Sequence, residues 1–216
     1  MESYVVIGLG RFGTELATRL YDCGEEVMVI DTNEILIDKI ADRVTRAVAA
    51  DARDIDVLRK LGVGNFDRAV VAVGTDLGTS ALITMNLKSL GVPFVMCKAQ
   101  DETYRAILEK LGANKVLIPE WEMADKLALG LTHAGVMEYI ELSQEYGIVE
   151  IKPTPAWVGK TIRELELRTR YGMNVIAVRV DEDTIQIPPD IDTPIPEDAG
   201  MVMLGSYAMF EKLKRN

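Results

Sequence analysis

The hydrophobic residues of the first 119 positions gather in short runs separated by amphipathic stretches of helical length. The runs are rich in Val, Ile and Ala, which is typical of parallel strands buried on both faces. We expect strands at 4–7, 27–30, 46–49, 68–73, 94–97 and 115–118, and helices at 12–22, 34–42, 55–61, 80–90 and 102–111. Six strands alternating with five helices predict a Rossmann-like, doubly wound α/β sheet.

Three of these expected helices end in a leucine followed by a glycine. The glycines are Gly62, Gly91 and Gly112. Glycine adopts the left-handed conformation of a helix C-cap without steric cost. The signals therefore support the predicted helix ends, and a strand follows each within a few residues.

The pattern changes after Pro119. Positions 120–132 predict a helix with one apolar stripe. This stripe could pack against the sheet of its own chain or against a second subunit. Further strands are expected at 137–142, 148–151, 173–180, 184–187 and 201–204, with a last helix at 208–213. We divide the chain into a Rossmann nucleotide-binding domain at 1–119, a crossover helix and linker at 120–136, and a small α+β domain at 137–216.

Two local signals organise the small C-terminal domain. Thr161 and Glu164 have the spacing of a capping box, which predicts a short helix through Leu165. The proline-rich stretch 188–196 predicts a loop, because proline denies a sheet one backbone donor.

Composition narrows the class of partner. The formal net charge of −10 argues against nucleic-acid binding. Cys23 and Cys97 form no CxxC pair, so we expect neither a disulfide framework nor a zinc site, and a reducing cytoplasm fits. No apolar run is long enough to cross a bilayer, so we expect no direct membrane insertion and any membrane association to run through a partner protein.

The sharpest chemical signal is the glycine turn at 8–13. It follows an expected strand and opens an expected helix, as a dinucleotide fingerprint requires. Gly8 allows the tight turn, Gly10 lets a pyrophosphate approach the backbone, and Gly13 permits close helix–strand packing. With Arg11 and Phe12 between them, the first helical amides are expected to face the phosphates.

Asp31 ends the second expected strand, 18 positions after Gly13. A carboxylate at about this spacing accepts hydrogen bonds from ribose hydroxyls and repels a 2′-phosphate, which disfavours NADP. Together the glycine turn and Asp31 predict an adenosine nucleotide.

Ligands of an open parallel sheet collect beyond the carboxyl ends of its strands, where several other polar residues are expected. Asp51, followed by Ala52, could accept from the adenine amino group or the ribose. Thr75 could contact the ligand, or could be a helix N-cap with Asp76 as a first-turn acid. Lys98 could approach a phosphate or remain a solvated lysine.

The sequence does not favour an enzyme. The one histidine, His133, follows the expected crossover helix, and we find no HExxH, Cys/His cluster or GxSxG motif. A hydride-transfer enzyme needs a proton donor near the nicotinamide, and none is evident.

Several segments together resemble the RCK (KTN) regulatory proteins of Ktr/Trk-type potassium uptake systems. They are VIGLGRFG at 6–13, KAQ at 98–100, IPE at 118–120, GKTIREL at 159–165 and YGMNVIAV at 171–178. The resemblance covers nearly the whole chain. One departure is Met173, where members often carry isoleucine before Asn-Val.

This resemblance implies a ring-forming homo-octamer, built from dimers, that docks on a membrane-embedded potassium-translocating subunit. It implies ATP and ADP competing for the Rossmann site, or NAD(H) in other members. Arg11 would contact the γ-phosphate across a dimer interface, Asp31 would hold the ribose, and Glu120 would help hold a divalent or monovalent cation. Cyclic di-AMP binds some members near the segment that matches 174–176.

Two alternatives stay open from the residues alone. The glycine turn with Asp31 fits NAD or NADH as well as ATP or ADP, and only Arg11 and the resemblance favour the latter. An NAD-dependent oxidoreductase, or an enzyme acting on nucleoside-diphosphate sugars, would need a catalytic centre that the sequence does not reveal.

Overall fold

The computed structural model describes residues 2–74, 76–132, 136–143, 145–181, 184–206 and 208–210. The chain divides into two compact units, Met1–Glu122 (unit 1) and Met123–Asn216 (unit 2). Helix α6 (Pro119–Thr132) begins in unit 1 and continues into unit 2. No helix among the described residues is long and apolar enough to span a membrane.

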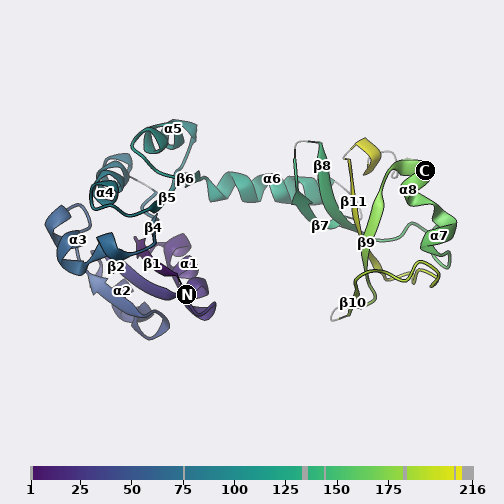
Figure 1. Cartoon of the computed structure of the whole chain (residues 1–216), viewed down its shortest axis with the longest axis horizontal. Helices are drawn as coiled ribbons and strands as arrows, with labels where there is room; N and C mark the ends of the chain where they lie inside the picture. Colours follow the sequence, from purple (N-terminus) through teal and green to yellow (C-terminus); the bar gives the residue numbers. More distant parts are fainter. Residues whose placement is uncertain are drawn as a thin grey trace. The chain divides into compact units, whose positions relative to one another are not determined.

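Unit 1 is built on a six-stranded parallel sheet, as the sequence predicts (Figure 1). Its order is β3-β2-β1-β4-β5-β6, and its strands are β1 (Ser3–Ile7), β2 (Glu26–Asp31), β3 (Arg46–Ala49), β4 (Arg68–Val71), β5 (Phe94–Lys98) and β6 (Lys115–Leu117). Ile7 lies opposite both Ile30 and Val71. The strand order therefore reverses at β1, which opens a crevice beyond its carboxyl end.

Helices cover both faces of this sheet. They are α1 (Arg11–Asp22), α2 (Glu34–Ile40), α3 (Ile55–Leu61), α4 (Leu77–Ser89) and α5 (Glu102–Lys110), with 3₁₀ turns at Ala41–Arg43 and Val63–Asn65. Val5 and Ile7 share one core with Leu58, Leu87 and Leu108 of α3, α4 and α5. The intervening Val6 packs with residues of α1 and α2 in a second core. The strands are apolar at successive positions because both faces of the sheet are covered by helices.

Some boundaries differ from the sequence prediction. Strand β4 ends at Val71, two residues earlier than expected, and Ala72 and Val73 line the crevice beyond it. Helix α4 begins at Leu77, three residues earlier than expected, because Asp76 caps it by accepting a hydrogen bond from the Gly78 amide at 2.9 Å. The three predicted C-cap glycines all have positive φ, between 76° and 101°.

Unit 2 is a five-stranded antiparallel sheet of order β10-β9-β11-β8-β7. Its strands are β7 (Val136–Glu141), β8 (Tyr146–Ile151), β9 (Asn174–Arg179), β10 (Ile185–Gln186) and β11 (Gly200–Ser206). Met173, Met201 and Met203 are fully buried and centre its core. Of the helix predicted at 208–213, residues 208–210 are helical and the remainder lies outside the described residues.

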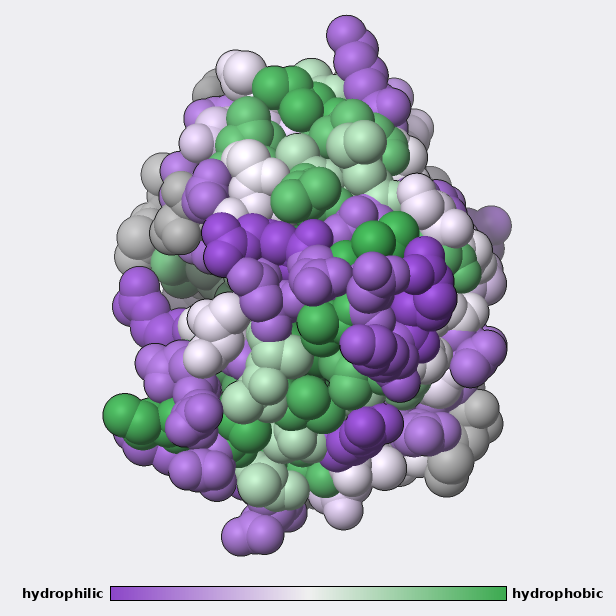
Figure 2. All heavy atoms as spheres, turned by 90° about the vertical axis from the view of Figure 1, so that its left-hand side faces the viewer, coloured by the Kyte–Doolittle hydropathy of each residue, from purple (hydrophilic) through white to green (hydrophobic). Residues whose placement is uncertain are grey.

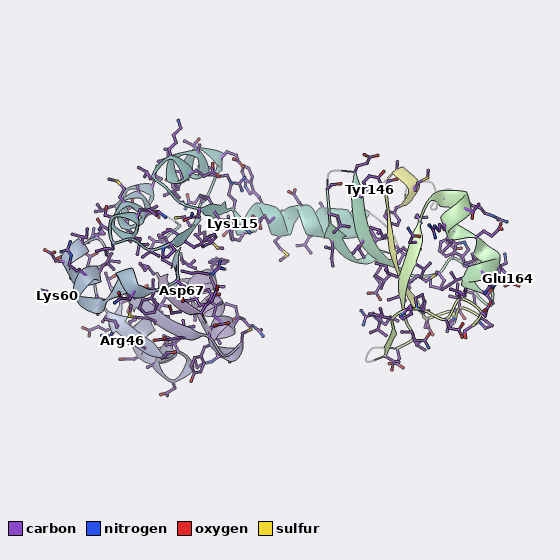
Figure 3. The ribbon with its side chains drawn as sticks, in the orientation of Figure 1. Arg46, Lys60, Asp67, Lys115, Tyr146 and Glu164 are labelled. Carbon is purple, nitrogen blue, oxygen red and sulfur yellow. The ribbon has the colours of Figure 1, made fainter. Side chains whose placement is uncertain are left out.

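The capping box is confirmed at α7 (Ile162–Leu165). Thr161 accepts from the Glu164 amide at 3.1 Å, and the Glu164 side chain, labelled in Figure 3, accepts from the Thr161 amide at 2.8 Å. A second short helix, α8 (Leu167–Tyr171), was not predicted. The two helices are separated by Glu166, which has the unusual φ of +49°.

Candidate nucleotide-binding site

The glycine turn between β1 and α1 is held by close backbone contacts. Gly8 has a φ of +98°, which only glycine adopts easily. A Cβ on Gly13 would lie 1.9 Å from the Gly8 carbonyl oxygen, so no larger residue fits there. A Cβ on Gly10 would meet nothing within 4 Å. Gly8 and Gly13 therefore fix the turn, whereas Gly10 leaves open space above it.

The amino terminus of α1 differs from those of the next helices in unit 1. Helices α2, α3, α4 and α5 each begin with an Asn or Asp whose side chain accepts from a first-turn amide. Helix α1 has Gly10 at its N-cap position, with no side-chain cap and no acidic residue in its first turn. Its amides are therefore available to an anion, which the helix dipole also favours.

Two adjoining cavities lie along the carboxyl ends of the strands. The first, of about 560 Å³, is lined by Gly8, Leu9, Gly10, Arg11, Phe12, Asp31, Ala72, Val73, Gly74, Lys98, Gln100 and Glu120. The second, of about 310 Å³, is lined by residues of 7–8, 30–32, 50–53, 73, 79 and 83. Because Gly8, Asp31 and Val73 line both, the cavities adjoin along one elongated site.

Asp31 stands where the two cavities meet. Its Oδ2 accepts from the Leu9 amide at 2.6 Å, and its Oδ1 accepts from the Asn33 amide at 2.8 Å. The carboxylate is thereby fixed between the glycine turn and the start of α2. Each oxygen retains a lone pair for a further donor such as a hydroxyl group.

Asp51 lines the second cavity, but its carboxylate is already engaged. Arg53 donates to it from Nε at 3.0 Å and from Nη2 at 2.6 Å, and this pairing lowers the pKa of Asp51. The sequence did not suggest this partner, although Arg53 lies only two positions away. The adjacent Ala52 is buried in the cavity wall.

Lys98 is not a solvated lysine, the alternative that the sequence left open. Its side chain is 19% exposed, and its Nζ lies 2.7 Å from Oε1 of Glu120, which is 65% exposed. The lysine ammonium is also 5.9 Å from the centroid of the Phe12 ring. The hydrogen bond from Lys98, with a smaller effect of the Arg11 charge, lowers the pKa of Glu120.

The remaining predicted residues have mixed outcomes. Arg11 is exposed and lines the first cavity, whereas Thr75 and His133 lie outside the described residues. Asp76 is itself the N-cap of α4 and not a first-turn acid. Within the described part of the chain, no group of three His, Cys, Asp or Glu side chains could hold a metal ion. A cation at Glu120 would therefore need ligands other than such a group.

Sequence reasoning missed Gln100 and Gly74 as lining residues. Gln100 follows Lys98 by two positions at the end of β5, so its place beyond a strand end was a usable signal. A Cβ on Gly74 would lie 3.2 Å from Cδ of Lys98, so the lysine stem packs closely over this glycine. Only the folded arrangement brings those two residues together.

Unit 2 has a cavity of its own, of about 380 Å³. It is lined by Ile162, Arg163, Glu166, Leu167, Arg168, Thr169, Met173, Asn174, Val175 and Ile191. It includes part of the 174–176 segment singled out from the sequence. Arg163 is paired with Asp192 at 2.6 Å, whereas Arg168 is exposed at the cavity.

Two family models match the chain, the TrkA-N domain over residues 4–119 and the TrkA-C domain over residues 147–216. Ktr system potassium uptake protein A of Bacillus subtilis is 36% identical over 202 residues, which cover 94% of this chain and 91% of that protein. Ktr system potassium uptake protein C of the same organism is 34% identical over 214 residues, covering 99% and 96%.

A solved structure described as the GsuK channel bound to NAD has the same fold, with a TM-score of 0.68 and 20% identity. It matches 99% of this chain, which spans 39% of that longer one. The fold and the glycine-turn site define a two-unit RCK protein with TrkA-N and TrkA-C domains. The chain belongs to the family of the Ktr-type potassium uptake proteins.

Proposed function

We propose that this chain is a cytoplasmic regulatory subunit of a potassium uptake system, switched by ATP against ADP at the unit 1 cavity. The observation that carries the proposal is the uncapped amino terminus of α1, which opens on a cavity that Asp31 also lines. The names of the relatives, both potassium uptake proteins, favour a regulatory role over an oxidoreductase.

The proposed pose follows from the chemistry of the walls. A diphosphate rests on the α1 amides above Gly10, where space is free. The ribose hydroxyls donate to the lone pairs that Asp31 retains, and the adenine enters the second cavity beside Ala52. The third phosphate then meets Lys98, a cation of the same cavity.

Only the third phosphate can provide the switch. ATP and ADP share the adenosine and diphosphate contacts, and a ligand shifts an equilibrium only through different affinities for the two states. We propose that Arg11 reaches this phosphate from a neighbouring subunit, which would couple ligand choice to subunit geometry. Glu120 would hold a cation beside it.

The first experiment is calorimetric titration of ligand-free protein with ATP, ADP, NAD and NADH. ATP binding in preference to ADP supports the proposal. Tight NADH binding without ATP binding would replace it with the second candidate, an NAD(H)-responsive regulator, which the glycine turn and Asp31 fit equally well. Absence of binding by all four would remove the nucleotide function altogether.

The Arg11 role has its own test. In Arg11→Ala we expect the ATP-over-ADP preference to fall by about tenfold, because a charge-assisted contact is lost. Arg19→Ala is the matched control, since Arg19 lies on the same helix but pairs with Glu15 at 2.9 Å outside the cavity. An unchanged preference in Arg11→Ala would remove Arg11 from the switch.

We further propose that the chain assembles as a homo-octameric ring under a membrane-embedded potassium-translocating subunit. Exposed apolar side chains support a protein interface on α4 and α5 (Leu82, Met85 and Ile107) and on α6 (Trp121, Met123 and Leu127). Figure 2 shows hydrophobic surface in the upper part of its view, the level at which Figure 1 draws α4 and α5, and also below the central hydrophilic band. Light scattering of the nucleotide-bound protein tests the octamer, and a smaller particle contradicts it.

Cyclic di-AMP is the ligand we propose for the unit 2 cavity. The exposed Arg168 there suits a phosphate, in a chain of net charge −10 that otherwise repels one. Titration of the full chain with cyclic di-AMP, with Arg168→Ala as the weakened variant, tests this site separately from unit 1. Equal binding by both proteins would place the ligand elsewhere.

A further inference from the structure

The Lys98–Glu120 ion pair joins two elements with different roles. Lys98 ends β5, and Glu120 lies in the first turn of α6, the helix that continues into unit 2. Their side chains meet at 2.7 Å inside the first cavity. Among the ion pairs of the described residues, this one ties α6 to the sheet of unit 1.

The two partners are unequally exposed to water. The lysine side chain is 19% exposed and the glutamate 65%. The lysine stem lies against Gly74, where even a Cβ would be 3.2 Å from its Cδ. If the pair separates, the glutamate is readily hydrated, whereas the lysine ammonium needs another anion within the cavity.

The lysine also lies close to the end of the glycine turn. Its ammonium lies 5.9 Å from the ring of Phe12, the second residue of α1. Gly10 and Arg11, which precede Phe12, line the same cavity. A phosphate chain that leaves the α1 amides would therefore present its terminal oxygens to a cation that already has a weaker, exchangeable partner.

We propose that Lys98 reads the terminal phosphate of ATP by changing partner, leaving Glu120 for the γ-phosphate. The exchange detaches Glu120, and with it the first turn of α6, from Lys98 at the end of β5, and leaves the Glu120 carboxylate to hold the cation proposed beside the third phosphate. ADP lacks the third phosphate and leaves the pair intact. This inference rests on the proposed nucleotide function and adds a route from the phosphate site to the helix that joins the units.

The binding test compares wild type, Lys98→Met and Glu120→Gln by calorimetry with ATP and ADP, in excess EDTA so that no divalent cation enters. Methionine keeps the apolar stem against Gly74 and removes only the charge. We expect Lys98→Met to weaken ATP binding by about tenfold and ADP binding much less. Glu120→Gln should tighten ATP binding several-fold, because Lys98 no longer has to leave a partner.

Lys115→Met is the matched control. Lys115, labelled in Figure 3, is an exposed lysine that begins β6 and is not among the lining residues of either unit 1 cavity. It carries the same change of charge, so it should bind both nucleotides as wild type does. Equal ATP weakening in Lys98→Met and Lys115→Met would overturn the proposal, because net charge would then explain the effect.

The fluorescence of Trp121 reports on α6. It would not change on ATP binding if Lys98 served only to pack the cavity wall. It follows Glu120 directly and is 49% exposed. We expect ATP, but not ADP, to change its fluorescence in wild type, and neither to do so in Lys98→Met. The change should disappear in Trp121→Phe, which identifies its source.

The outcomes distinguish a failure of the proposed nucleotide function from a failure of the partner exchange. Wild type that binds neither nucleotide would end the proposed function. Wild type that prefers ATP, with Lys98→Met showing the same preference, would overturn the partner exchange and leave the function standing. Identical Trp121 signals with ATP and ADP would equally overturn the release of α6.

Discussion

Units 1 and 2 present their candidate ligand cavities through different parts of the chain. In unit 1 the cavity rests on backbone: the Gly8 turn, the amides of α1 and the Leu9 amide that fixes Asp31. In unit 2 the cavity is lined largely by residues of α7, α8 and β9. A backbone site depends on the residues that have no side chain, so its glycines are the most sensitive positions.

The two sheets also differ in what packs in their cores. The unit 1 sheet is packed against helices on both faces, with separate cores on each. The unit 2 sheet places Met201 and Met203 in its core, while Glu150 is buried at 4% exposure and paired with Arg179 at 2.7 Å. Unit 2 thus contains an ion pair with a buried carboxylate where the unit 1 cores consist of apolar contacts, and each unit should respond to a different kind of substitution.

The largest effect is expected from Gly13→Ala. Its Cβ would lie 1.9 Å from the Gly8 carbonyl oxygen, so the turn must move and unit 1 should lose about 2–4 kcal/mol of stability. Hydrogen exchange resolved by peptide should place the loss in unit 1 and leave unit 2 protected as before. Loss in both units would show that they do not unfold independently.

Gly10→Ala is the counterpart at the same turn. Gly10 has a φ of −67° and open space around it, so alanine is compatible with the fold. Stability should stay within about 0.5 kcal/mol of wild type, while ATP and ADP binding both fall. Normal binding by Gly10→Ala would place the phosphates away from the α1 terminus.

The next effect belongs to unit 2. A Cβ on Gly200 would lie 2.1 Å from Oε1 of Glu150, so Gly200→Ala must displace that carboxylate from Arg179. We expect unit 2 to lose about 1–3 kcal/mol in chemical denaturation. Nucleotide affinity should not change, and a parallel loss of ATP binding would contradict the independence of the two units.

Asp31→Asn should have a smaller effect that appears mainly in binding. The asparagine oxygen can replace only one of the two acceptors that the Leu9 and Asn33 amides use. We expect ATP, ADP and NAD(H) all to bind about tenfold more weakly, because the ribose loses its charged acceptor. A loss confined to one ligand would show that Asp31 does not serve the common ribose.

The sequence predicted the features that depend on neighbouring residues, such as strands, helix ends and caps. The apolar runs gave the six strands, the glycines at 62, 91 and 112 marked helix ends, and the Thr161–Glu164 spacing marked a cap. Helix α8 was missed because the break before it is a glutamate at positive φ, a conformation that no local pattern marks.

Side-chain partners in the candidate site were the less predictable part. Asp31 follows from its strand end and its spacing from the glycine turn. The Lys98–Glu120 pair does not, because it joins the ends of elements 22 positions apart and depends on the space above Gly74. Asp51 lines the second cavity as a strand-end residue, but its pairing with Arg53 was not predicted.

Cys97 offers a pH-dependent comparison within unit 1. Burial raises the pKa of its thiol from 9.0 to about 11, partly offset by the hydrogen bond with Thr84. Stability from the neutral thiol is complete below pH 9 and is lost as the pH rises towards 11. Between pH 8 and 10 the expected loss is about 1.4 kcal/mol. Cys97→Ala should lack this part of the pH dependence, and matching curves for the two proteins would contradict the assignment.

The smallest effect is expected at the start of α7. Thr161→Ala removes the acceptor of the Glu164 amide and should lower the stability of unit 2 by about 1 kcal/mol. Glu164→Gln is the control, because its amide oxygen can still accept from the Thr161 backbone. Since α7 lines the unit 2 cavity, Thr161→Ala should also weaken a ligand bound there without changing ATP binding in unit 1. A change in ATP affinity would mean that the cavities are coupled even through a local cap.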